Sequence, residues 1–394
     1  FTLKGNSGTI GDAYKLDAAS QLTGTKYGAS NASENYSGVN NASSMESWTY
    51  DAGGNRLTSE STATINYAAN DINQYTTVGA IHPEYTDRGD LANYGDWQYA
   101  HDAFGHLIRA HNIQNNLLAK YTYDAFGRRV AKDVNGAKTL FFNQGALQLE
   151  AYDISSASSE SIIYEPGIDR PIAKVTNSGA LVFFHQDWLG SVVLLTDHAG
   201  TTLQRFKYDS WGKVQGYDAA NNQISESTYA ARFLFTAREF DAETGLYHYR
   251  ARTYSPELGR FTEFDPIGFS GGDYNLARYV SNNTVNLTDP LGTRIRTAGD
   301  PKNFGDNYEE ITWETPEERK KIEEGDREML EAAEKVPIEI AVDLAVPGPE
   351  NVLADAIVDQ ILDPIKDAIT DLIHDLIDPL LHPPNDPQSN SGGE

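Results

Sequence analysis

The chain has 394 residues, of which 33 are glycine and 2 are methionine, and aromatic residues make up 11% of it. This balance favours β-strands punctuated by turns over helices. Because cysteine is absent, disulfides, thiolate metal sites and cysteine nucleophiles are excluded. The net charge of −26 argues against nucleic acid and anionic lipid as partners. No apolar run of about 18 residues or more is present to span a membrane.

The charge is unevenly distributed along the chain. After Gly292 the sequence holds 25 acidic and only 9 basic residues, so the last quarter carries most of the net charge. This change of composition predicts a boundary between two regions just after Gly292.

A short motif, Tyr-x-Tyr-Asp-x-x-Gly-Arg, recurs in the first two-thirds of the chain. Self-similarity of this kind is typical of proteins built from repeated structural units. Clear copies occupy residues 48–56, 121–128 and 206–213, a copy with one additional residue occupies 99–107, and degenerate copies begin at Tyr14, Tyr67 and Tyr85.

Each copy of the motif predicts a β-hairpin. Aromatic residues two apart, such as Tyr121 and Tyr123, lie on one face of a strand. Asp at the first and Gly at the fourth position of the next four residues are typical of a type I turn, in which the carboxylate accepts a backbone N–H. One hairpin cannot bury its tyrosine face alone, so we expect neighbouring hairpins to lie side by side.

Residues 233–292 are the most distinctive stretch of the sequence. They combine an Arg- and Tyr-rich strand pattern with two Asp-Pro-x-Gly elements, which begin at Asp265 and Asp289. Together with the repeated motif and residues 185–212, this block resembles the repeat-associated core of RHS/YD-repeat proteins. That family includes bacterial RHS proteins, the C components of insecticidal toxin complexes and teneurins. The resemblance covers residues 14–292.

The resemblance implies a mainly β fold, in which YD-repeat hairpins form a spiralling antiparallel β-shell and the core segment plugs one end. We expect a repeat region at 1–232, the repeat-associated core at 233–292, and an acidic helical variable region at 293–394 with a disordered end. The copies are few for a closed shell, and the chain opens on Phe1 in strand-like sequence without a visible signal peptide. We therefore expect the last part of a longer protein.

The resemblance also implies a candidate catalytic site. In the family's core an Arg and two Asp cut the chain in cis, and the matching residues are Arg252, Asp265, 13 residues later, and Asp289, another 24 residues on. Such a pair needs carboxylates so close that one keeps its proton as an acid while the other activates water. A guanidinium nearby favours the ionised partner. The cut bond would be Thr293–Arg294, where the composition changes.

Two features favour a structural reading of the same residues. Cleaving members of the family usually carry Leu where this chain has Thr293, so the core could keep its architecture without the reaction. Asp-Pro is also a common turn starter, so Asp265 and Asp289 could cap turns that contain Gly268 and Gly292. The arginine would then pair with a structural carboxylate.

No other pattern in the sequence indicates a cofactor or a metal. The 9 histidines are scattered without metal-ligand spacing. The sequence contains no phosphate-binding G-x-x-x-x-G-K-[ST] loop and no nucleophile elbow. We therefore expect no cofactor and no metal, and interpret the histidines as wall residues.

The C-terminal region has helical patterns. Thr315 and Pro316 predict the start of a helix that runs to about residue 336. Between residues 352 and 377 apolar residues recur every three to four positions, opposite aspartates at every fourth position. The apolar stripe would bury against the shell interior, a sister helix, or an immunity or delivery-machinery protein. In polymorphic toxins of the family this segment is a variable effector, but its sequence here predicts no particular activity.

Three functions fit these patterns. The first is structural: a shell that encloses, displays or delivers its C-terminal segment as cargo, secreted from a bacterium or at its surface. The second is enzymatic: an aspartyl autoprotease that frees residues from Arg294 onward with Asp265, Asp289 and Arg252. The third is a cell-surface adhesin that binds glycans through exposed tyrosines.

Overall fold

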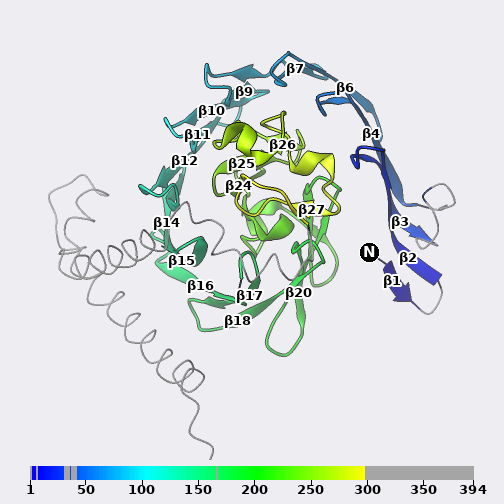
Figure 1. Ribbon diagram of the computed structural model, residues 1–394. Helices are drawn as coiled ribbons and strands as arrows, with labels where there is room; N and C mark the ends of the chain where they lie inside the picture. Colours follow the sequence, from blue (N-terminus) through cyan, green and yellow to red (C-terminus); the bar gives the residue numbers. More distant parts are fainter. Residues whose placement is uncertain (1, 6–7, 31–35, 37–41, 166, 298–394) are drawn as a thin grey trace, which may run out of the picture. The chain divides into compact units, whose positions relative to one another are not determined.

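The computed structural model describes residues 2–5, 8–30, 36, 42–165 and 167–297, which form antiparallel strands joined by short turns. This confirms the expected mainly β fold, whereas the expected C-terminal helices lie outside the described residues. Two large sheets form a curved wall, residues 2–224, around an inner segment that we call the plug, residues 225–297 (Figure 1).

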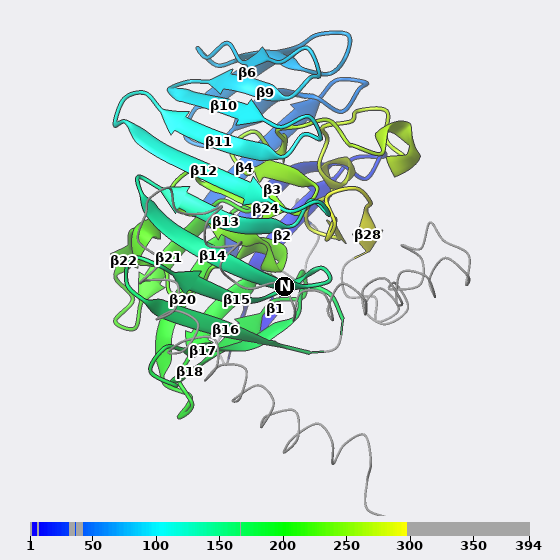
Figure 2. The ribbon, with the colours of Figure 1, turned by 90° about the vertical axis from the view of Figure 1, so that its left-hand side faces the viewer.

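The wall is a meander, because within each sheet every strand pairs with its neighbours along the chain. Figure 2 shows these strands from the side, one beside the next. The first sheet contains β1 (Thr2–Gly5), β2 (Gly8–Leu16), β3 (Leu22–Ser30), β4 (Ser44–Tyr50), β5 (Arg56–Glu60), β6 (Thr64–Ala69) and β7 (Tyr75–Val78). The second contains β8 (Glu84–Tyr85), β9 (Leu91–Tyr94), β10 (Trp97–His101), β11 (Leu107–Asn112), β12 (Leu117–Tyr123), β13 (Arg129–Val134), β14 (Ala137–Gln144), β15 (Leu147–Asp153), β16 (Ser158–Tyr164), β17 (Pro171–Thr176), β18 (Leu181–Gln186), β19 (Val192–Thr196), β20 (Thr202–Tyr208), β21 (Val214–Asp218) and β22 (Gln223–Ile224).

The repeated Asp and Tyr each make one kind of hydrogen bond. Oδ1 of Asp124 accepts the N–H groups of Phe126 and Arg128, both at 2.9 Å, and so closes its own turn. The hydroxyl of Tyr123 donates to the carbonyl of Leu107 at 3.0 Å, in the hairpin before. The motif therefore closes each hairpin and also ties it to its predecessor. The same tyrosine bond to the preceding hairpin is made by Tyr50, Tyr164 and Tyr208.

The glycine of the motif is needed for conformation and for space. Gly127 has φ +74°, and a Cβ there would lie 2.8 Å from Nε2 of His106 in the preceding turn. Gly89 has φ +97°, and a Cβ there would lie 2.2 Å from the ring of Phe264 in the plug. The turns therefore pack closely on one another and on the plug.

Alternate residues of the wall face the plug. In β12, Ala119 and Tyr121 are buried whereas Lys120 and Thr122 are exposed, the period of a strand with one buried face. Two apolar clusters join wall and plug. One packs wall residues such as Phe206 against plug aromatics, and the other packs wall tyrosines against plug leucines. The core of the molecule is therefore the contact between the two parts.

The two wall sheets complete one circuit around the plug. At one junction the N–H of Tyr75 in β7 donates to the hydroxyl of Tyr85 in β8 at 3.1 Å. At the other, the turn after β20 reaches β3 and β4: the Ser210 and Thr25 hydroxyls lie 2.7 Å apart. Trp211, in the same turn, packs edge-on against the Trp48 ring of β4. The sequence spacing of the repeats did not predict this closure.

The plug is an aromatic four-stranded sheet followed by a strand pair and irregular segments. Its elements are the 3₁₀ turns η1 (Glu226–Thr228), η2 (Phe235–Ala237), η3 (Gly268–Gly271) and η4 (Val280–Asn282), with β23 (Glu239–Asp241), β24 (Leu246–Tyr249), β25 (Arg252–Ser255), β26 (Arg260–Phe261), β27 (Leu287–Thr288) and β28 (Arg296–Thr297). Buried ion pairs fix its orientation in the wall: Arg129 and Lys132 of β13 contact the carboxylate of Asp241 at 2.7 and 3.1 Å. Removing one partner of such a pair would leave a buried charge without its counter-ion, which is costly. These pairs therefore hold the plug in one position against the wall.

Candidate functional site

Arg252 stands at the start of β25, and its surroundings fix the plane of its guanidinium. The side chain is 4% exposed and lies 3.7 Å from the centre of the Phe261 ring. Nη1 donates to the carbonyl of Leu276 at 2.9 Å, and Nε donates to the carbonyl of Gly292. These contacts leave Nη2 available for the acidic residues.

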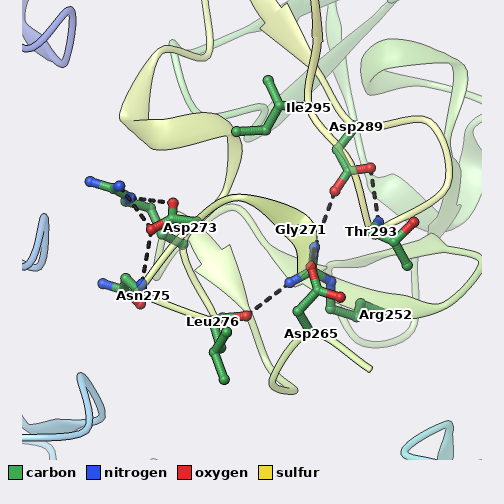
Figure 3. Close-up of a pocket in the computed structure, with 10 residues that line it drawn as sticks. Arg252, Asp265, Gly271, Asp273, Asn275, Leu276, Asp289, Thr293 and Ile295 are labelled. Carbon is green, nitrogen blue, oxygen red and sulfur yellow. Dashed lines mark hydrogen bonds and ion pairs between the residues drawn. The ribbon is translucent and has the colours of Figure 1, made fainter. Parts of the chain in front are cut away.

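Asp265 and Asp289 converge on that one nitrogen. Nη2 of Arg252 lies 3.1 Å from Oδ2 of Asp265 and 3.1 Å from Oδ2 of Asp289 (Figure 3). The two carboxylate side chains are 8% and 2% exposed. The structure therefore brings together all three residues of the predicted site, although they are far apart in sequence.

Both aspartates also begin turns, as the structural reading expects. Oδ1 of Asp265 accepts the N–H of Ile267 at 3.0 Å, and its backbone carbonyl accepts the N–H of Gly268 at 2.9 Å. Oδ1 of Asp289 accepts the N–H of Thr293 at 3.0 Å and that of Arg294 at 2.9 Å. Each carboxylate thus closes its turn with one oxygen and reaches the guanidinium with the other.

The Thr293–Arg294 peptide lies between the two carboxylates. Its N–H is the one that Asp289 accepts from Arg294. Its carbonyl oxygen faces Asp265 across Gly271: a Cβ at Gly271 would lie 2.8 Å from Oδ2 of Asp265 and 3.2 Å from the Thr293 oxygen. The absence of a side chain at Gly271 therefore keeps open a small space between this carboxylate and the carbonyl.

A small pocket occupies this space. The volume of the pocket that the centre of a water molecule can reach is about 20 Å³. This volume is enough for one water. An ion pair between Arg278 and Asp273, 2.7 Å apart, forms one side of it. The pocket is lined by Arg252, Asp265, Gly271, Asp273, Asn275, Leu276, Arg278, Asp289, Thr293 and Ile295.

Burial dominates the electrostatics of the site. It raises the pKa of Asp289 and of Asp265, and the charge of Arg252 lowers each pKa by less than burial raises it. Asp289 accepts two backbone N–H groups, which favour its ionised form, whereas Asp265 accepts one. The two carboxyl groups thus differ in the support given to their charge, as a catalytic acid and base require.

Gly292 fits a space that no other residue could occupy without strain. Its φ is +72°, and a Cβ there would lie 2.3 Å from the carbonyl oxygen of Tyr249. This close approach places the Gly292 carbonyl on Arg252. The glycine of the second Asp-Pro-Leu-Gly element therefore sets the path of the chain into the Thr293–Arg294 peptide.

Some contributors were not found from sequence. Gly271 belongs to a Gly-Gly pair that reads only as a turn, and Leu276 acts through its backbone carbonyl, which leaves no side-chain signal. Their roles depend on how residues 265–295 fold back on β25.

The histidines of the described residues do not form a metal site. Within residues 2–297, leaving out the few not described, no group of three or more His, Asp or Glu side chains is arranged to hold a metal ion. His101 lies 3.2 Å from Glu263 in the interior, and His106 pairs with Asp102 of its own turn at 2.9 Å.

Among the described residues, no helix has the length and hydropathy needed to cross a bilayer.

Fold and site together define a β-wall of repeated hairpins that surrounds an inner plug containing an Arg and two Asp. The family model described as Teneurin YD-shell matches residues 13–277, and the chain therefore belongs to this family. Similar folds occur in two solved structures that contain TccC3. One is TcdB2-TccC3 without its hypervariable C-terminal region, with a TM-score of 0.56 and 20% identity over 72% of this chain and 15% of that chain. Another is the Photorhabdus luminescens Tc holotoxin pore, with a TM-score of 0.57 and 21% identity over 75% of this chain and 16% of that one.

Curated relatives include large bacterial toxins. The tRNA3(Ser)-specific nuclease WapA of Bacillus spizizenii is 31% identical over 254 residues, which are 62% of this chain and 11% of that protein. Double-stranded DNA deaminase toxin A of Burkholderia cenocepacia is 28% identical over 283 residues, 63% of this chain and 19% of that protein. The chain thus spans between a tenth and a fifth of the length of these relatives.

Proposed function

We propose that residues 2–297 form the closing end of a shell that houses the C-terminal segment of the same chain and carries it out of the producing bacterium. The support is the position of the plug. It packs against the wall through two apolar clusters and buried ion pairs. Its last strand, β28, pairs with β27, so residues up to Thr297 still belong to the plug.

The relatives favour a common shell with exchangeable cargo. One is named a tRNA nuclease and another a DNA deaminase toxin, two unrelated chemistries, yet each matches a similar share of this chain, 62% and 63%. A shared shell with different cargo accounts for this pattern. The cargo of the present chain would be residues 294–394, with an immunity or delivery protein as a further partner.

Limited proteolysis tests whether the cargo is housed. The region after Thr293 contains Lys and Arg residues that trypsin can cut. If the shell encloses it, these sites are protected in the native full-length chain and cut at once after the wall is unfolded in urea. Rapid native cleavage at these sites, with the wall intact, would indicate display outside the shell instead.

Recovery of the protein from the culture medium of its producer tests delivery.

A second function, self-cleavage, is favoured by one observation: the two buried carboxylates share Nη2 of Arg252 and flank the Thr293–Arg294 peptide. In the proposed reaction Asp289, held ionised by Arg252 and two backbone N–H groups, accepts a proton from a water in the pocket. The water oxygen bonds to the Thr293 carbonyl carbon. Asp265, which accepts one backbone N–H where Asp289 accepts two, keeps its proton and donates it to the carbonyl oxygen.

The intermediate then collapses. Asp289 passes the proton that it took from water to the nitrogen of Arg294, which lies 2.9 Å from Oδ1. The bond between that nitrogen and the Thr293 carbon breaks, and Asp265 regains its proton from the oxygen. The products are a chain that ends in a Thr293 carboxylate and a segment that begins at Arg294. Because the proposed reaction uses main-chain groups, we expect it to tolerate Thr293 in place of the usual Leu.

The proposed roles fix the sign of the pH dependence. The rate falls on the acid side when Asp289 becomes protonated, and on the basic side when Asp265 loses its proton. Burial raises the pKa of both groups, so both limbs lie above the ordinary aspartate range.

Intact mass of the purified chain tests the proposal. Wild type is expected to yield a fragment that ends at Thr293, and Asp289→Asn is expected to stay whole while keeping its fold. The matched control is Asp197→Asn. Asp197 also closes a turn, by accepting the N–H groups of Ala199 and Thr201 at 2.9 and 2.8 Å, but it is exposed and lies in the wall. A wild-type chain that remains whole after long incubation at several pH values would refute self-cleavage.

The glycan-binding alternative finds less support. Among the described tyrosines the rings are buried or partly buried, apart from Tyr274, which is 88% exposed. The faces that were expected to stack on sugars therefore point into the wall and plug.

A further inference from the structure

Asp169 is a wall residue that reaches the plug. It lies in the turn between β16 and β17, has φ +61°, and is 9% exposed. Its Oδ1 accepts Nη2 of Arg238 and, at 2.7 Å, Nη2 of Arg250. Its Oδ2 accepts Nη1 of Arg250 at 3.2 Å. One buried carboxylate of the wall thus holds two arginines of the plug.

Both arginines in turn hold the backbone beside Asp289. Nη1 of Arg238 donates to the carbonyl of Pro290 at 3.3 Å, and Nη1 of Arg250 donates to the same oxygen. Nε of Arg250 also donates to the carbonyl of Ala146, in the wall turn between β14 and β15, at 3.1 Å. Two wall hairpins therefore anchor the second Asp-Pro-Leu-Gly element.

The carbonyl of Pro290 is an effective place to fix this loop. The proline ring fixes φ, so holding the carbonyl also fixes ψ and orients the neighbouring Asp289. Pro290 also borders a cavity of about 580 Å³ that Asp169 and Thr288 line. Next to this cavity the loop has little packing to hold it, so its orientation depends on the polar contacts to its carbonyl.

The two arginines depend on the carboxylate of Asp169. Burial lowers the pKa of Arg238, and the charge of Arg250 lowers it further. Without Asp169 two guanidinium groups would lie side by side in a buried place with uncompensated charge, which is strongly unfavourable. They would move apart and release the Pro290 carbonyl.

We propose that Asp169 is a positioning residue for self-cleavage: through Arg238 and Arg250 it holds Pro290, and so aims Asp289 at the Thr293–Arg294 peptide. This inference rests on the proposed self-cleavage. Its consequence is that the plug cuts the chain only after the wall has wrapped around it, because one part of the clamp is a wall turn. Release of the C-terminal segment is thereby coupled to completion of the shell.

The first test compares cleavage rates after refolding of the full-length chain. Asp169→Asn removes the charge but keeps the size, and Asn tolerates positive φ. It is expected to slow cleavage by about 10- to 100-fold, the cost of a catalytic group misplaced by about 1 Å. Glu165→Gln, in the same turn but on the exposed Glu165–Arg170 pair, is the control and should cut at the wild-type rate. An Asp169→Asn chain that folds and cuts as fast as wild type overturns the inference.

The second test does not require cleavage. In an Asp265→Asn background, which the proposed chemistry cannot cut, hydrogen exchange followed by mass spectrometry reports on the Thr293 and Arg294 amides. Asp169→Asn should speed exchange in residues 287–294 and leave the wall unchanged, whereas general destabilisation would speed exchange everywhere. Unchanged exchange in residues 287–294, or an increase throughout the chain, overturns the positioning role. If wild type stays whole, self-cleavage fails and exchange alone decides the positioning claim.

Discussion

The wall and the plug use one turn device in two environments. In the wall, Asp124 closes its turn with Oδ1 and pairs through Oδ2 with Arg128, 2.7 Å away, whose side chain is 36% exposed. In the plug, Asp289 closes its turn with Oδ1 and pairs through Oδ2 with Arg252, which is 4% exposed. In both turns one carboxylate oxygen accepts backbone N–H groups and the other contacts an arginine. The turns differ in which amides are accepted and in the origin of the arginine, which is local for Asp124 and 37 residues away for Asp289. They differ most in access to water and in the second acid, Asp265, on the same guanidinium.

These differences distinguish the structural turns of the wall from the proposed catalytic site of the plug. An exposed ion pair contributes about 0 to 1 kcal/mol and leaves both groups charged. Two buried carboxylates on one cation cannot both be ionised without a large cost, so a proton is retained in the pair. The repeat therefore supplies an Asp turn that can be copied many times, and the proposed self-cleavage requires an Asp turn that is buried beside a second acid.

The sharpest test of this comparison removes each arginine. Arg252→Met leaves two buried carboxylates without their cation and should lower the free energy of unfolding by about 3 to 5 kcal/mol. Arg128→Met in the wall should lower it by less than about 1 kcal/mol. Urea unfolding followed by tryptophan fluorescence measures both. Equal effects would mean that burial does not distinguish the two turns.

In one turn of the wall an aspartate is buried, as the two aspartates of the plug are, and its pKa is raised for the same reason. Asp209 closes the turn that seats on β3 and β4, and burial, with the nearby charge of Glu46, raises its pKa from 3.8 to about 6. Tyr27 and Arg56 are its other charged or titratable neighbours across this junction. The folded state therefore holds this proton more tightly than the unfolded chain does.

The sign of the pH effect follows from that raised pKa. The stabilisation is complete below the unfolded pKa of 3.8 and is lost as pH rises through about 6. It amounts to about 2 to 3 kcal/mol at most. Asp209→Asn should flatten this part of the curve of unfolding free energy against pH, measured between pH 4 and 7. Asp197→Asn, at another wall turn, is the control. The backbone N–H of Thr201 lowers the pKa of Asp197, so this variant should leave the slope between pH 5 and 7 unchanged. A wild-type slope in Asp209→Asn would contradict the assignment.

Residue patterns predicted the hairpins, and the family resemblance predicted the residues of the candidate site. The Tyr spacing and the Asp and Gly of each turn predicted the hairpins, because those contacts lie within a few residues of one another. The resemblance named Arg252, Asp265 and Asp289, and the structure places them together.

What was not predicted depends on distant contacts. The packing of Trp211 on Trp48 joins the turn after β20 to β4, and Asp169 reaches Arg250 across 81 residues of sequence. Neither residue has a distinctive local pattern, because an Asp in a turn reads the same whether it faces water or two buried arginines. The expected tail helices lie outside the described residues.

Glycines provide a smaller test of the same comparison. Gly292 and Gly200 both have positive φ, +72° and +80°, but a Cβ at Gly292 would lie 2.3 Å from the Tyr249 oxygen, and one at Gly200 meets nothing within 4 Å. Both variants to Ala carry the conformational cost of about 1 to 2 kcal/mol. Gly292→Ala should cost about 1 to 3 kcal/mol more, as overpacking does. Thermal unfolding measures the gap, and equal melting temperatures would contradict the close approach.

The smallest expected effect tests whether the wall is a sum of similar units. Tyr123→Phe and Tyr208→Phe each remove a hydrogen bond between neighbouring hairpins, 3.0 and 2.6 Å long, and each should cost about 0.5 to 1.5 kcal/mol. Because the two bonds lie several hairpins apart, the double variant should show the sum within about 0.5 kcal/mol. Tyr274→Phe, on the exposed Tyr274 of the plug, is the control and should change nothing. A double variant far from the sum in urea unfolding would mean that the wall responds as one body, held by the plug and not by its nearest-neighbour bonds.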